Sequence, residues 1–161
     1  MFRPGIYFAL SLALLTTPLA CKKETRWDKA AENAEKKADE KKPEGIQPGS
    51  AFNKFFPPEA DGFKRVYTQE KEGFAEAKLQ QDGKDVATLS ISDTWNNPDA
   101  KSKFANATDK VSDYPLMLVG KNQSTALVKD RYQVKVSSQT LDEGTRKTWI
   151  SKFDLKGLSS L

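Results

Sequence analysis

The sequence predicts an α+β fold, with an antiparallel sheet of about six strands and two helices packed on one face of the sheet. Three observations predict this class. Six short segments in the C-terminal two thirds of the chain alternate apolar and polar residues or are continuously apolar, as strands are. Two other segments repeat apolar residues at helical spacing. The links between strands are short, which favours antiparallel pairing in the order β-β-β-α-β-β-β-α.

The first three strands are predicted at residues 63–69, 73–80 and 84–92. The second and third strands form a hairpin around Gly83. A two-residue loop would place Lys78 opposite Ala87 and put a charge on the apolar face of the hairpin. A three-residue loop with Gly83 in the left-handed conformation places Ala77 opposite Ala87 and keeps that face apolar. The sequence therefore predicts the three-residue loop with a G1 bulge.

A helix is predicted to follow these strands. Asn97 suits the N-cap, Pro98 the first helical position and Asp99 the first turn. Four apolar residues then recur at helical spacing and form one stripe: Ala100, Phe104, Ala107 and Val111. We therefore expect this helix to extend through residue 111 and to bury that stripe.

The last strands are predicted in the segment that follows this helix. Residues 116–119 are continuously apolar, which is typical of a strand at the centre of a sheet. Residues 125–128 and 131–138 predict a second hairpin. Three of its side chains are expected to face the core: Tyr132, Val134 and Val136.

A second, amphipathic helix is predicted at the C-terminus, because Trp149, Ile150 and Phe153 lie on one helical face. It closes a folded domain that we place at residues 51–161. At roughly 110 residues, this stretch has the usual size of a single domain.

Charge and composition exclude several functional classes. The chain has 26 basic and 22 acidic residues and a net charge of +4. Acidic residues accompany the basic ones nearly everywhere, whereas a nucleic-acid-binding surface clusters basic residues of unopposed sign. The chain has no histidine, which excludes imidazole bases and imidazole metal ligands. We therefore expect neither a nucleic-acid partner nor a cofactor.

Residues 1–20 have the pattern of a signal peptide. Arg3 supplies a positive charge, and the apolar run at residues 6–15 follows it. A membrane-spanning helix needs about 20 apolar residues, so this run is too short to be one. The chain becomes polar immediately after Cys21, its only cysteine.

The five residues 17–21, Thr-Pro-Leu-Ala-Cys, resemble the lipobox of bacterial lipoproteins. Ala20 and Cys21 match that class, whereas Pro18 and Leu19 depart from its usual residues. The resemblance covers residues 1–21 only. It implies a diacylglyceryl group on the thiol of Cys21 and cleavage of the signal peptide before that residue. It also implies export, with a lipid anchor in a bacterial membrane and the domain in the periplasm or at the cell surface.

Residues 21–50 predict a charged tether between the anchor and the domain. Lysine, glutamate, aspartate and alanine alternate through most of it, which favours a flexible or partly helical spacer. Alanine buries too little surface to drive a coiled coil. Pro43, Gly45, Pro48 and Gly49 end the helical pattern.

Aromatic residues supply two candidate binding surfaces. Phe52, Phe55 and Phe56 cluster before two prolines and either fasten the start of the domain to its core or form an exposed patch for a partner. Trp95 lies in a polar loop, residues 93–99, that could face a ligand. The oxygen donors of that loop do not have the spacing of an EF-hand, and we predict no metal site.

These observations predict a membrane-anchored envelope lipoprotein with a small, non-catalytic binding or assembly domain. Its partners would be membrane lipid, through acylated Cys21, and an envelope protein. The alternative is a histidine-free, carboxylate-dependent hydrolase of the cell envelope. A deep pocket with converging carboxylates would favour the hydrolase, whereas an apolar surface around Phe52, Phe55, Phe56 or Trp95 would favour binding.

Overall fold

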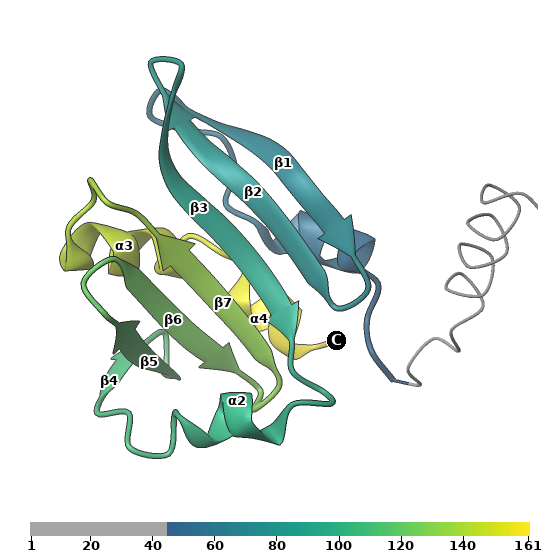
Figure 1. Ribbon diagram of the computed structural model, residues 1–161. Coiled ribbons are helices and arrows are strands. Elements are labelled where there is room, and N and C mark those ends of the chain that lie inside the picture. The colour runs from purple at the N-terminus through teal and green to yellow at the C-terminus, as the bar shows by residue number, and fades with distance from the viewer. Residues whose placement is uncertain (1–44) are drawn as a thin grey trace, which may run out of the picture. The chain divides into compact units, whose positions relative to one another are not determined.

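The computed structural model describes residues 45–161, and Figure 1 shows them as a twisted antiparallel sheet with short helices. The predicted signal peptide, Cys21 and the tether up to residue 44 lie outside the described residues. Within the described part the sheet has seven strands and not the six that were predicted.

The strands are β1 (Phe63–Lys71), β2 (Phe74–Gln81), β3 (Lys84–Asp93), β4 (Asp109–Val111), β5 (Tyr114–Val119), β6 (Gln123–Val128) and β7 (Tyr132–Ser137). The helices are η1 (Gly49–Phe55), α2 (Pro98–Ser102), α3 (Glu143–Ser151) and α4 (Leu155–Ser159). Neighbouring strands follow the order β1-β2-β3-β7-β6-β5-β4. Two meanders, β1 to β3 and β4 to β7, are therefore joined by the pairing of β3 with β7.

β7 is the central strand, and the prediction that its alternate residues face the core is confirmed. Tyr132, Val134 and Val136 are all 0% exposed. They face the side of the sheet that η1, α3 and α4 cover. The intervening residues Gln133 and Lys135 consequently lie on the second face.

The seventh strand comes from a segment that was predicted to be helical. α2 begins with the expected N-cap, since the side chain of Asn97 accepts a hydrogen bond from the amide of Ala100. It ends at Ser102, however, and Val111 lies in β4, where it pairs with Tyr114. A three-residue strand is too short to show an alternation in the sequence, so its apolar residue matched the helical spacing by coincidence.

The helices were expected to cover one face of the sheet, but they lie on both faces. α3 and α4, two short helices where one was predicted, pack with η1 over the core. Asp154 separates them, because its side chain caps the start of α4 by accepting from the amide of Gly157. α2 instead contacts the second face, where Gln133 Nε2 donates to the carbonyl of Ala100 at 2.8 Å.

β5 is not central but lies beside the edge strand β4. Leu116 is buried in the core, whereas Leu118 and Val119 are 43% and 49% exposed. A continuous apolar run is typical of a strand covered on both faces. Here the helices cover only part of one face, and the apolar residues of the other face line a groove.

The hairpin of β2 and β3 has a two-residue turn, so the predicted three-residue loop is wrong. Asp82 (φ 50°) and Gly83 (φ 74°) both adopt the left-handed conformation that a type I′ turn requires. The register then shifts by one residue at Val86, so that Leu79 pairs with Ala87. This bulge keeps the apolar side chains on one face, which is the requirement that had suggested the longer loop.

Tyr132 places a polar group in the apolar core, and a variant can test whether that group is hydrogen-bonded. Its hydroxyl is buried and has no hydrogen-bond partner among residues 45–161. We expect Tyr132→Phe to leave the free energy of unfolding unchanged or raise it by about 1 kcal/mol, because an unpaired buried hydroxyl is unfavourable. Urea unfolding measures the change. Tyr132→Ala is the control and should cost about 3–5 kcal/mol. A loss of more than about 1 kcal/mol in Tyr132→Phe would mean that the hydroxyl has a partner.

Candidate functional site

Phe52, Phe55 and Phe56 lie in the core and do not form a surface. They are 0%, 3% and 5% exposed. The ring of Phe52 meets Tyr132 edge-on at 5.9 Å, and Phe56 lies 5.3 Å from Phe153. The exposed-patch alternative is therefore wrong for these residues, which fasten η1 to the sheet and to the C-terminal segment.

Trp95 is the one predicted surface residue that is accessible. It follows β3 and is 50% exposed. The guanidinium carbon of Arg131 lies 4.5 Å from the centre of its ring, within the range of a cation–π contact. Its indole also lies against Gly45, where an added Cβ would approach the ring to 3.0 Å. Trp95 therefore covers the place where the chain enters the domain.

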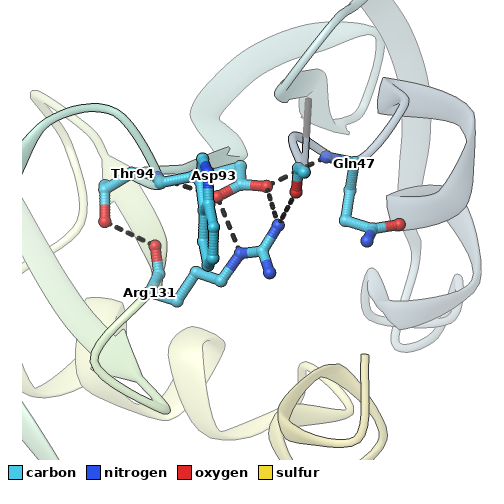
Figure 2. Close-up of polar contacts among 6 residues, drawn as sticks. Gln47, Asp93, Thr94 and Arg131 are labelled. Atoms are coloured by element: carbon cyan, nitrogen blue, oxygen red, sulfur yellow. Dashed lines mark hydrogen bonds and ion pairs between the residues drawn. The ribbon is translucent and has the colours of Figure 1, made fainter. Parts of the chain in front are cut away.

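Beneath Trp95, Asp93 and Arg131 form a hydrogen-bonded ion pair (Figure 2). Arg131 Nε donates to one carboxylate oxygen of Asp93 at 3.0 Å, and Nη2 donates to the other at 2.8 Å. The same carboxylate accepts hydrogen bonds from two backbone N–H groups, that of Gln47 at 3.0 Å and that of Trp95 at 2.9 Å. The side chain of Asp93 is 0% exposed, so this Asp93–Arg131 cluster is a shielded, bidentate pair.

The environment of Asp93 acts on its pKa in two directions. Burial alone raises the pKa of this carboxyl. The hydrogen bond from Arg131, the two amide hydrogen bonds and the charge of Arg131 outweigh burial and hold the pKa below its ordinary value. The carboxylate in turn raises the pKa of Arg131. Asp93 is thus ionised in the folded protein at neutral pH.

The Asp93–Arg131 cluster fixes residues 45–47 to the domain. Arg131 Nη2 also donates to the carbonyl of Gly45 (Figure 2). The backbone carbonyl of Gln47 accepts a hydrogen bond from the backbone N–H of Gly73 at 2.8 Å. The chain is therefore attached to the sheet before residue 51, where the domain had been expected to start. The ion pair and its neighbours therefore hold residues 45–47 against the sheet.

A groove lies on the second face of the sheet, between α2 with its following turn and strands β5, β6 and β7. Its volume is about 480 Å³. Phe104, Met117 and Val119 provide apolar surface, and Thr125 and Gln133 provide polar groups. Phe104 is 7% exposed and closes one end from the side of α2. We refer to this site as the lysine groove, for the two charged residues that line it.

The charged side chains of the lysine groove are Lys103 and Lys135. Burial lowers the pKa of Lys135, and repulsion from Lys103 lowers it further. Neither ammonium group forms an ion pair with any residue from 45 to 161. Two cations therefore line one partly apolar groove, and no carboxylate of the described residues neutralises them, which is unfavourable until an anion binds.

A second groove on the same face also contains a lysine, but this lysine has a carboxylate partner. It has a volume of about 430 Å³ and is lined by Lys78. Lys78 lies 3.8 Å from Asp85 and donates to Thr88 at 3.2 Å. Its charge is thus compensated within the fold, whereas no carboxylate in the described part of the chain forms an ion pair with Lys103 or Lys135.

The sequence did not indicate the lysine groove. Lys135 alternates with Val134 and Val136, and a lysine at such a position normally lies on a solvated face. Lys103 belongs to a segment with several nearby lysines. Only the placement of α2 over β7 brings the two together. The apolar run of β5 was the one signal, and it was interpreted as core.

No family model, curated protein or solved structure matches this chain. Among residues 45–161, no group of three or more acidic or cysteine side chains is arranged to hold a metal ion. The same residues include no helix with the length and apolar character needed to cross a membrane.

Proposed function

We propose that this protein is an exported lipoprotein, anchored to a bacterial membrane through Cys21, whose domain binds a ligand in the lysine groove without catalysing a reaction. The observation that carries the binding role is the pair of lysines, Lys103 and Lys135, which lie beside apolar surface and form no ion pair with residues 45–161. An arrangement that is unfavourable in the empty protein is expected where a ligand supplies the missing charge.

The anchor rests on the position of Cys21 at the boundary between the apolar run and the charged segment. Each buried methylene contributes about 0.8 kcal/mol, and a single myristoyl chain binds only marginally. Two or three acyl chains on one cysteine would make attachment effectively permanent. Lys22 and Lys23 would each add about 1 kcal/mol on an anionic membrane surface.

The lining of the lysine groove favours binding over the hydrolase alternative. A carboxylate-dependent hydrolase needs two acidic side chains whose pKa values are moved apart. The charged residues of this groove are both lysines. Apolar side chains with a few convergent polar groups are the usual lining of a small-molecule site.

Replacing Cys21 with serine tests the anchor. We expect Cys21→Ser to move from the detergent phase to the aqueous phase in phase partitioning, because the thiol that carries the acyl chains is gone. Mass spectrometry of the purified chain should show loss of the diacylglyceryl mass. Lys22→Gln is the matched control, since it removes a neighbouring charge and keeps the thiol, and should stay in the detergent phase. The anchor is disproved if Cys21→Ser stays in the detergent phase and its mass differs from that of the native chain only by the exchange of sulfur for oxygen.

A further inference from the structure

The chemistry of the lysine groove identifies the class of its ligand. Lys103 and Lys135 line the same groove and provide two positive charges there. Met117, Val119 and Phe104 provide apolar surface within the same groove. We infer that the lysine groove binds a single-chain anionic amphiphile, a molecule with one acyl chain and a phosphate or carboxylate head group. This inference rests on the binding role proposed above.

The head group is expected at the two ammonium groups. An anion there receives charge-assisted hydrogen bonds from both lysines and removes the repulsion between them. Gln133 is not free to turn toward the ligand, because it holds α2 through the carbonyl of Ala100. The two lysines therefore recognise the negative charge, and the amide of Gln133 keeps α2 in place beside it.

The acyl chain is expected along Met117 and Val119. Val119 is 49% exposed, so a bound chain would remove a large apolar surface from water. The groove volume of about 480 Å³ is near the lower end of the range for small-molecule sites. That size suits one chain better than two.

Lysine labelling on the full chain tests this inference at single residues. The chain is treated with an amine-acetylating reagent, with and without dodecyl phosphate below its critical micelle concentration, and each lysine is followed by mass spectrometry. We expect acetylation of Lys103 and Lys135 to slow about tenfold at a ligand concentration ten times the Kd. Lys78 and Lys84 should react at unchanged rates. Equal slowing at all four lysines, or none at Lys103 and Lys135, would overturn the inference.

Three further ligands separate the head group from the chain. Dodecanoate should protect both lysines of the groove, since it shares the negative charge and the chain. Inorganic phosphate and the neutral dodecyl maltoside should not protect at the same concentration. If either of these two protects as well as dodecyl phosphate, the groove binds but the ligand class is wrong. If no ligand protects, the binding role itself fails, whatever Cys21→Ser shows about the anchor.

A variant pair tests whether Lys135 is part of the site. Lys135→Met should raise the Kd for dodecyl phosphate about tenfold, because one of two charge contacts is lost. At the same ligand concentration, the slowing of Lys103 acetylation should then fall from about tenfold to about twofold. It should also raise the melting temperature of the ligand-free chain, since it removes a poorly solvated charge. Lys78→Met, on the same face, should leave protection unchanged. Lys135→Met with full protection would overturn the inference, and its melting temperature shows that the variant is folded.

Discussion

Gly49→Ala is expected to lower the free energy of unfolding by about 3 kcal/mol, an effect typical of severe overpacking. Gly49 is buried at the start of η1. A Cβ at this position would lie 2.4 Å from the carbonyl oxygens of both Lys71 and Phe74. These are backbone atoms at the turn between β1 and β2, so they cannot move aside as a side chain could. Thermal unfolding should show a decrease of roughly 12 °C in the melting temperature.

Gly144→Ala is the matched control for Gly49→Ala. Gly144 lies in α3, and the nearest heavy atom to an added Cβ is a carboxylate oxygen of Asp142 at 3.5 Å, an ordinary contact. Alanine is a better helix former than glycine, so this variant should be more stable by about 0.5–1 kcal/mol. If Gly49→Ala were as stable as the native chain, η1 would not be packed against the turn between β1 and β2.

Asp93→Ala is expected to cost about 3–5 kcal/mol, because it leaves the guanidinium of Arg131 without its partner in a poorly solvated position. The amides of Gln47 and Trp95 also lose their acceptor. The double variant Asp93→Ala/Arg131→Met should be more stable than Asp93→Ala alone, since the unpaired charge is removed. Asp109→Ala is the control: its ion pair with Lys147 is exposed to solvent and should contribute little to stability. Urea unfolding of the four chains measures each difference.

The loss of stability in Asp93→Ala should depend on pH, and the direction of this dependence follows from the pKa of Asp93. The pKa of Asp93 is lower in the folded protein than in the unfolded chain. The unfolded chain therefore takes up the proton first as the pH falls, and the stabilisation is lost as the pH passes through the folded pKa. The difference between the native chain and Asp93→Ala should be complete above about pH 5 and should shrink toward pH 2. A difference that stays constant from pH 7 to pH 2 would contradict the role assigned to the carboxylate.

Local patterns predicted most elements of the fold. The strands β1, β2, β3, β6 and β7 lie close to the predicted segments, because alternation with a short turn is a property of neighbouring residues. The N-cap at Asn97 was likewise predicted from adjacent residues. The errors lie at the turn between β2 and β3, at the segment of α2 and β4, at the position of β5 and at the C-terminal helix, which is divided in two. A strand of three residues is too short to show a pattern, and an apolar run does not tell which face of the sheet the helices cover.

The candidate site was harder to predict than the fold. Phe52, Phe55 and Phe56 form a conspicuous aromatic cluster, and the sequence left open whether they were core or surface. Their burial depends on η1 folding back over β2, a contact between segments that only the tertiary structure brings together. Lys135 showed the opposite problem. It looked like an ordinary outward residue of a strand, and its burial arises from α2 and Lys103 on the second face.

The sequence by itself determined the positions of β1, β2, β3, β6 and β7, the cap at Asn97 and the core-facing residues of β7, because these depend on patterns along the chain. It also supplies the basis for the proposed anchor at Cys21, which depends on the boundary between apolar and charged residues. Only the tertiary structure decided the strand order, the Asp93–Arg131 cluster and the lysine groove. Each of these joins residues more than 30 positions apart, as Asp93 with Arg131 and Lys103 with Lys135. Burial, and with it the effect of a charge, is set by which distant segments pack together and not by the neighbouring sequence.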